Sequence, residues 1–199
     1  MILTLDAALG PCAAGLVHPD GSVQELRLDA ARGNLARLPL LVAELLAGRT
    51  ARVLRAVAVT VGPGSFTGIR AALALAHGIG LAGGCPVLGV TIGAALAWDA
   101  PPGRPFWTAI DSRRGRVFLE RDGTVRSYAL DDLPDPDGPI SLAGDAAPFV
   151  ATRLMARGHT IVVMQATHPT PAGIAAASRD PLPPQPLYVD PPEARPSTD

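Results

Sequence analysis

Histidines and serines are the first residues to inspect for catalysis in this sequence of 199 residues. No two histidines have the HxxxH or HExxH spacing that places two metal ligands on one helix face, and no serine lies in a GxSxG turn. The histidines are His18, His77, His159 and His168. Because a histidine without clustered ligands is rarely a metal site, each is expected to pack or to face solvent. The sequence predicts no catalytic residue, no metal and no cofactor.

A glycine-rich segment at residues 59–70, VTVGPGSFTGIR, could form a binding turn. It reads as a buried strand, a turn and a helix start, in which Gly62 and Gly64 permit a positive φ or a close backbone approach. Ser65 or Thr67 can cap the helix, and exposed N–H groups at such a start favour anions. The Walker A pattern is absent, and Thr67 stands where the dinucleotide fingerprint needs its last glycine. A plain strand-to-helix turn is the alternative.

Two acids, Asp6 and Asp111, end predicted strands at comparable places in the two halves of the chain. Such carboxylates can hold a metal ion or water beside bound phosphates. However, Asp6 is soon followed by Leu9, and Asp111 by the pair Arg113 and Arg114, which do not suit a phosphate-binding hairpin. We therefore expect a vestigial nucleotide cleft, with a working one as the alternative. The arginine pair could instead grip a phosphate or a partner's carboxylate.

Composition indicates one compact protein without a strong electrostatic partner. Hydrophobic residues make up 48% of the chain, and 17 basic against 18 acidic residues give a net charge of -1. A protein that grips nucleic acid alone usually has a basic excess, so any contact with RNA is expected to run through a partner. Cys12 and Cys85 lack CxxC spacing and are expected to be reduced, core-packed thiols.

The ends and apolar runs of the sequence predict a cytoplasmic protein without membrane contact. The opening residues, MILTLD, lack the basic region of a signal peptide. Glycine, histidine or arginine interrupts the longest apolar stretches, so none is expected to reach the length of a membrane span.

Hydrophobic periodicity then predicts the elements that position these residues. In the first half, we expect strands at residues 2–5, 12–17, 22–28, 55–61 and 87–90. Helices are expected from about residue 35 to Gly48, over 67–83 and from Thr91 to about Trp98. The sequence Pro101-Pro102-Gly103 breaks the chain and predicts a lobe boundary at residue 103.

The second half reads as a worn copy of the first, without its first helix. Strands are expected at 106–110, 116–121, 124–130, 140–142 and 161–164, and helices at 146–157 and 171–179, while residues 131–138 hold too much proline and aspartate for a helix. Residues 187–189 could add an edge strand within the proline-rich tail. A duplicated lobe of this kind is the α/β plan of the actin, hexokinase and Hsp70 superfamily, with strand-end acids facing each other across a cleft. We therefore predict an actin-like fold with lobes at 1–103 and 104–199, each with a mixed sheet and packed helices.

The run GPGSFTGIR resembles the signature of the TsaB family, also called YeaZ. The opening MILTLDAALGPCAAGL, the segment ALAHGIGLAGGCPVLGVTIGAALA, IDSRRGRVFLE and PLYVDPP are similar to other parts of that family. Residues 1–120 are well covered and residues 121–180 only loosely. The signature turn comprises Gly62, Pro63, Gly64, Ser65, Phe66, Thr67, Gly68 and Arg70.

This resemblance implies an actin-like fold and a non-catalytic role as the partner of a catalytic subunit, TsaD. TsaD joins threonylcarbamoyl to the adenosine 3′ of the anticodon in tRNAs that read codons starting with A, and TsaE, a small ATPase, completes the assembly. Contact with tRNA is expected only through the complex. Two departures weigh against independent nucleotide binding: Gly33-Asn34 replaces a His-Ser pair, and Asp6-Ala7 replaces Asp-Thr.

The predicted helix at 67–83 has an outward face that suits a partner. A helical wheel places Ala72, Leu75, Ile79 and Ala82 toward the sheet, and the opposite face carries few charges for a solvated one. We expect this face and two leucines of the preceding helix to dock a TsaD-like subunit or a second copy of the chain. The expected interface residues are Leu40, Leu41, Arg70, Leu73, Ala74, His77, Gly78 and Leu81. The alternative is that both helix faces are buried within the lobe.

Two other functions remain open from the sequence. One is a small actin-like enzyme, either a kinase-like phosphotransferase or a glycoprotease-type hydrolase. The other is a regulator that only binds a nucleotide. The missing acid, base and metal patterns disfavour the enzyme.

Overall fold

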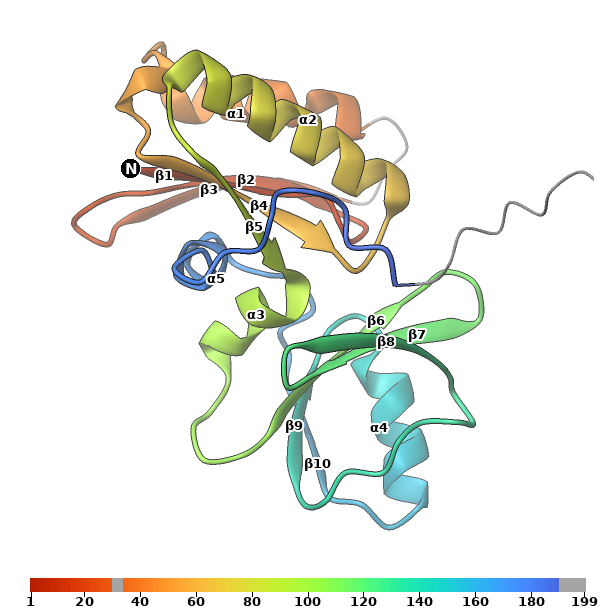
Figure 1. Cartoon of the computed structure of the whole chain (residues 1–199). Helices are drawn as coiled ribbons and strands as arrows, with labels where there is room; N and C mark the ends of the chain where they lie inside the picture. The colour runs from red at the N-terminus through yellow and green to blue at the C-terminus, as the bar shows by residue number, and fades with distance from the viewer. Residues whose placement is uncertain (30–33, 190–199) are drawn as a thin grey trace, which may run out of the picture.

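The computed structural model describes residues 1–29 and 34–189, and within them the chain forms two five-stranded mixed sheets with packed helices (Figure 1). The first sheet has the order β3-β2-β1-β4-β5. Its strands are β1 (Ile2–Asp6), β2 (Cys12–Val17), β3 (Val23–Leu28), β4 (Ala56–Gly62) and β5 (Val87–Thr91). β1, β2 and β3 pair antiparallel, whereas β1, β4 and β5 pair parallel. All of β4 is buried, as its continuous apolar run predicts.

Helices cover both faces of the first sheet. The helices α1 (Leu38–Leu46) and α2 (Phe66–Gly83) lie on one face, and the short helices α3 (Ile92–Leu96) and α5 (Pro171–Ala177) lie on the other (Figure 1). Short 3-10 turns at Asn34–Arg37, Ala51–Val53 and Ala97–Asp99 complete this half.

The second sheet repeats the first. Its order, β10-β9-β6-β7-β8, is that of the first sheet read from the opposite edge. Its strands are β6 (Phe106–Asp111), β7 (Arg116–Arg121), β8 (Thr124–Ala129), β9 (Ile140–Ala143) and β10 (Ile161–Val163). One helix, α4 (Ala147–Ala156), packs on it, and residues 130–139 form no helix. The duplicated sheet, and the missing helix of the second half, are therefore confirmed.

The chain returns to the first sheet after β10. Helix α5 contacts β1 and β2, and the backbone N–H of Leu187 donates to the Val61 carbonyl over 2.9 Å. Segments expected in the second lobe thus lie on the first, while the boundary at residue 103 stays a prediction. The predicted edge strand at 187–189 is wrong: one hydrogen bond forms and no ladder follows, because nearby prolines lack donors.

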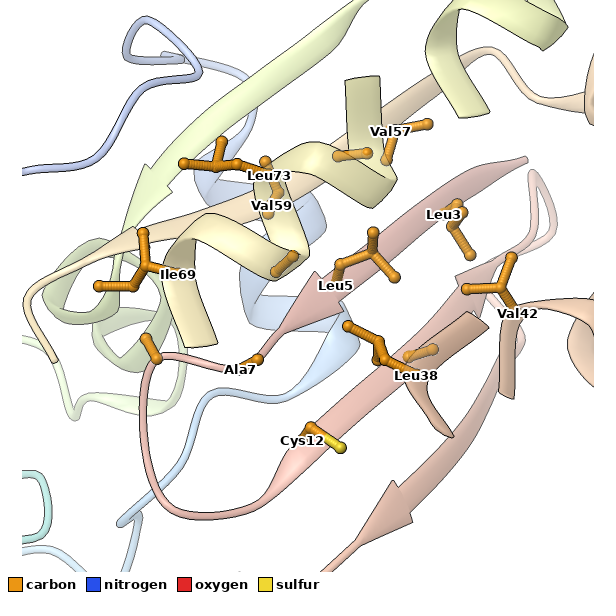
Figure 2. Close-up of a cluster of buried hydrophobic side chains, with 14 of the residues drawn as sticks. Leu3, Leu5, Ala7, Cys12, Leu38, Val42, Val57, Val59, Ile69 and Leu73 are labelled. Carbon is orange, nitrogen blue, oxygen red and sulfur yellow. The ribbon is translucent and has the colours of Figure 1, made fainter. Parts of the chain in front are cut away.

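The largest hydrophobic cluster lies between the first sheet and helices α1 and α2. Figure 2 shows its side chains converging from β1, β4 and both helices, among them Leu5, Leu38 and Val59. Cys12 is a buried thiol in this cluster, and Cys85 is only partly buried. Burial raises the pKa of both thiols, which keeps them protonated.

Helix α2 is long and apolar enough to cross a membrane by length and composition alone, with 18 residues and a mean hydropathy of 1.2. The expectation that no apolar run reaches this length is wrong. A core helix meets the same test, and α2 packs on the first sheet through buried residues that include Ile69, Ala72 and Ala76.

Candidate functional site

The glycine-rich turn packs against the loop that follows β1. Gly62 and Gly64 have φ of 118° and 152°, which confirms the predicted left-handed backbone, and the Gly62–Pro63 peptide is cis. A Cβ on Gly64 or Gly68 would overlap the backbone carbonyl of Ala8 or Ala7. The Ser65 N–H donates to the Ala8 carbonyl over 2.6 Å, so the helix start holds protein backbone at this point. This favours the plain turn over an anion site.

Helix α2 begins with one of the two predicted caps. The Ser65 hydroxyl oxygen accepts a hydrogen bond from the Gly68 N–H over 3.2 Å. Thr67 lies within the first turn and is exposed. Phe66 is 55% exposed, and the Arg70 guanidinium stacks 3.9 Å from its ring centroid.

Asp6 is almost completely buried at the end of β1, with 1% of its surface exposed. Its Oδ1 accepts from the Thr60 hydroxyl over 2.7 Å and from the Ala8 N–H over 3.1 Å. Its Oδ2 is buried and has no hydrogen-bond partner among the described residues. Burial raises the pKa of Asp6, although the hydrogen bonds from Thr60 and Ala8 oppose the shift.

Asp111, at the end of β6, lies in a different environment. Its side chain is 41% exposed, and its Oδ1 accepts from the Arg113 N–H over 2.7 Å. The Arg113 guanidinium lies 3.4 Å from Asp111 Oδ2 and 2.9 Å from Asp145 Oδ2. Asp145 in turn accepts from the Asp111 N–H over 2.9 Å. Arg113 therefore pairs with two carboxylates of its own lobe, and gripping a phosphate would require these contacts to break.

His168 lies in the loop before α5, where its ring nitrogen is 2.8 Å from the Thr167 hydroxyl. It interacts electrostatically with both Asp6 and Asp145, and burial lowers its pKa more than these acids raise it. Sequence reasoning placed His168 in a surface or packing role, because it lies 162 residues from Asp6 and no short motif joins them. Arg114 donates its backbone N–H to the Ser112 hydroxyl over 3.2 Å. Residues 1–29 and 34–189 contain no cluster of three histidine, cysteine or acidic side chains that could hold a metal.

The expected docking face needs two corrections. Leu41 and Leu73 are buried, at 7% and 5% exposure, rather than facing outward. Leu41 falls on the core stripe because helix α1 begins at Leu38 and buries positions three, four and seven residues later. Leu73 lies four residues after the buried Ile69 and three before Ala76 on α2. Ala82, expected toward the sheet, is instead exposed.

The outer surface of α2 is divided into three strips. On one side, Arg70 donates to the Tyr188 hydroxyl over 2.8 Å, and the His77 ring lies 3.1 Å from the Pro184 carbonyl oxygen. The C-terminal segment therefore occupies this side. On the other side, an apolar groove of about 510 Å³ separates α2 from the start of α1. It is lined by Leu35, Ala36, Leu38, Pro39, Ala71 and Leu75.

Between these two sides of α2 lie the exposed residues Ala74, Gly78 and Leu81. Together with the exposed Leu40 on α1, across the groove, they form what we call the docking strip. Leu81 is 87% exposed and Leu40 64% exposed. Gly78 has open space where a Cβ would lie, so a partner's helix could approach the backbone there. Gly33, one of the departures from the family pattern, lies outside the described residues.

Comparisons with known proteins identify the family. A family model described as TsaD, tRNA N6-adenosine threonylcarbamoyltransferase, matches residues 28–137. The Escherichia coli tRNA threonylcarbamoyladenosine biosynthesis protein TsaB is 31% identical over 122 residues, which cover 59% of this chain and 52% of that protein. The chain belongs to the TsaB (YeaZ) family.

Other matches extend along nearly the whole chain. An uncharacterized protein of Mycobacterium tuberculosis is 34% identical, covering 98% of this chain and 94% of that protein. The structure of YeaZ from Pseudomonas aeruginosa superposes with a TM-score of 0.74 at 22% identity, covering 94% of this chain and 98% of the other. A second Pseudomonas aeruginosa structure, of a protein with similarity to peptidase YEAZ, gives a TM-score of 0.78 at the same identity, covering 95% and 99%. The fold is the actin-like one that the duplicated sheets predicted.

Proposed function

We propose that this chain is a non-catalytic subunit of the complex that installs threonylcarbamoyl on the adenosine 3′ of the anticodon in tRNAs reading A-starting codons. In this role it binds and supports a TsaD-like catalytic subunit in the cytoplasm, a TsaE-like ATPase joins the same assembly, and tRNA is contacted only through the complex. The observation that carries the proposal is the docking strip, a neutral apolar surface on the two outer helices of a TsaB-family protein.

The shape of this surface supports a helical partner. Leu40 and Leu81 project from two helices that flank an apolar groove. Ala74 and Gly78 have small side chains or none, so a partner could approach the helix backbone between the leucines. Apolar side chains that enter this groove would bury the exposed leucines and gain hydrophobic free energy. The same surface could pair with a second copy of the chain, so a homodimer in the absence of TsaD is the competing occupant.

The polar groups between the two lobes support a non-catalytic role. Arg113 pairs with both Asp111 and Asp145, and Asp6 is almost completely buried. A phosphate that approached Asp111 would meet two carboxylates and one arginine, and the excess negative charge would repel it. We therefore propose no cofactor for this subunit.

The test is co-purification of the full chain with the TsaD-like protein of the same organism, analysed on a sizing column. The double substitution Ala74→Glu with Leu81→Glu should abolish the complex, because two charges would be buried at the interface. Its melting temperature should stay near that of the unchanged protein, since both residues are exposed. An intact complex with the double variant would rule the docking strip out.

A matched control is available on the second lobe. Phe149 and Met155 on α4 are 63% and 48% exposed, and Phe149→Glu with Met155→Glu adds the same charge to another apolar helix surface. This variant should bind the TsaD-like protein as the unchanged chain does. If both double variants lose binding equally, general repulsion rather than a specific surface would explain the loss.

One observation favours the alternative of an actin-like enzyme: the buried Oδ2 of Asp6 has no partner in the described chain. In a phosphotransferase, such an oxygen would hold a metal-bound water beside a phosphate. ATP hydrolysis by the partner-free protein that disappears in Asp6→Asn would establish this function. Absence of turnover with an intact TsaD complex would support the partner role.

A further inference from the structure

The hairpin of β7 and β8 carries a pocket that lies outside the strand-end acids and the docking strip. Its volume is about 320 Å³, and it is lined by Leu119, Arg121, Asp122, Thr124, Arg126 and Tyr128. The register pairs Arg121 with Thr124 and Leu119 with Arg126. Since directly paired residues share a face and successive residues alternate, both arginines project on the same side of the hairpin, diagonally across the two strands.

The two arginines lack the acidic partners that other arginines of the second lobe have. Arg113 and Arg157 both bind aspartates. By contrast, neither Arg121 nor Arg126 makes an ion pair or a hydrogen bond within the described parts of the chain, and Asp122 is the single acid that lines the pocket. Two guanidinium groups held near each other repel, and a bound anion would relieve this repulsion.

Neighbouring groups orient these donors. The Arg121 guanidinium lies 5.3 Å from the centroid of the Trp107 ring, and only 5% of the surface of Trp107 is exposed. This cation–π contact holds Arg121 at the pocket without using its N–H donors. Thr124 and Tyr128 add hydroxyl groups to the same lining. The pocket thus has one guanidinium oriented by an aromatic ring, a second on the exposed Arg126, and neutral donors beside them.

We propose that this pocket binds a phosphoryl group. Guanidinium groups match the oxygen geometry of phosphate through paired N–H donors, and arginine, threonine and tyrosine are typical phosphate ligands. The same chemistry serves a free phosphate and a phosphodiester of an RNA backbone. The chain has a net charge of -1, so the pocket would be a local anion site and not part of a general basic surface.

The experiment is a titration of the full chain with inorganic phosphate at constant ionic strength, followed by calorimetry. A parallel titration uses an RNA dodecamer with hydroxyl ends, which offers phosphodiesters and no monoester. Saturable binding of either probe is expected, and Arg126→Gln should weaken it about tenfold, the loss expected for one charge-assisted hydrogen bond. Arg126 is exposed and unpaired, so circular dichroism should show an unchanged fold.

Two further measurements decide the interpretation. Arg52→Gln changes an exposed arginine of the first lobe and should leave binding within twofold. In a Trp98→Phe background, Trp107 is the one remaining tryptophan, and its emission should change on binding because Arg121 shifts toward the anion. Binding of phosphate alone would assign the site to small phosphate compounds, and tighter binding of RNA would assign it to a nucleic-acid backbone. No saturable binding of either probe, or equal affinity in Arg126→Gln, would overturn the proposal.

Discussion

The two lobes share one strand order, but the acids that end their first strands differ in burial and in hydrogen-bond and charge partners. Asp6 is almost completely buried, its Oδ1 accepts from the Thr60 hydroxyl, and burial disfavours its charge. Asp111 stays partly exposed and pairs with Arg113. In the hairpin after Asp111, a Cβ at Gly115 would meet nothing within 4 Å among the residues that the structure describes. Equivalent positions in a duplicated fold therefore acquire their chemistry from the elements that pack over them.

The lobes also differ in how their sheets are covered. Helices cover both faces of the first sheet, whereas the second has α4 on one face and meets the first lobe with the other (Figure 1). At this contact, Glu120 of β7 accepts from the Thr91 hydroxyl over 2.6 Å and from the Gly93 N–H over 3.0 Å. A side chain at Gly93 would overlap the Glu120 carboxylate. The buried Glu120 of β7 thus joins the second lobe to the start of α3.

The largest expected loss of stability comes from a substitution in the glycine-rich turn of the first lobe. Gly64→Val should lower the free energy of unfolding by about 3 kcal/mol, because strain at positive φ adds to overlap with Ala8. Gly115→Val, at φ 72° with open space around it, should cost about 1–2 kcal/mol. Urea unfolding of both variants measures the difference. Equal losses would show that packing over the turn does not distinguish the lobes.

The contact between the lobes should be the next most sensitive place. Glu120→Ala should cost about 2 kcal/mol, since it leaves buried donors of Thr91 and Gly93 without their acceptor. Asp135→Ala removes exposed pairs to Arg157 and His159 and should lower stability much less than Glu120→Ala does. Thermal unfolding of the two variants at neutral pH provides the test. A larger loss in Asp135→Ala would contradict the importance of the buried acid.

The contribution of an acid to folding stability should change with pH in opposite directions for the buried and the exposed acids. Burial raises the folded-state pKa of Asp6 and Glu120 above the ordinary values of 3.8 and 4.5. Their contribution to stability is therefore complete below these values and is lost as pH rises through the folded pKa. Hydrogen bonds from His159 and Arg157 lower the pKa of Asp135, whose contribution is present above 3.8 and lost as pH falls through its folded pKa.

Two substitutions test these opposite pH dependences of stability. Glu120→Gln should raise the stability at pH 7 relative to that at pH 4, because it removes a carboxylate that resists charging in the folded state. Asp135→Asn should shift the same difference in the opposite direction. Denaturant titrations at the two pH values measure both, and shifts of the same sign would refute the assignment.

The smallest effect concerns surface glycines of the two lobes. Gly78, within α2, has open space for a Cβ, so Gly78→Ala should stabilise the protein by about 0.5–1 kcal/mol through helix propensity. Gly158, after α4, also has open space but a φ of 91°, and Gly158→Ala should destabilise by about 1 kcal/mol. Melting temperatures should move in opposite directions, and two increases would show that backbone conformation does not decide the outcome.

Much of the fold followed from the sequence alone. Alternating and continuous apolar runs predicted the ten strands of the two sheets within a few residues, because side-chain periodicity reports local burial. The same reading predicted the glycine-rich turn with its positive φ at Gly62 and Gly64, and the run GPGSFTGIR was sufficient to point to the TsaB family.

Tertiary packing decided the remaining features. A helical wheel left Leu41 and Leu73 on the outer face, but the position of each helix on its sheet buried them. The return of α5 to the first sheet joins residues far apart in sequence, and so does the hydrogen bond that the Gly93 N–H of α3 donates to Glu120. Periodicity records which side of its own element a residue occupies, whereas these contacts depend on which other element arrives there.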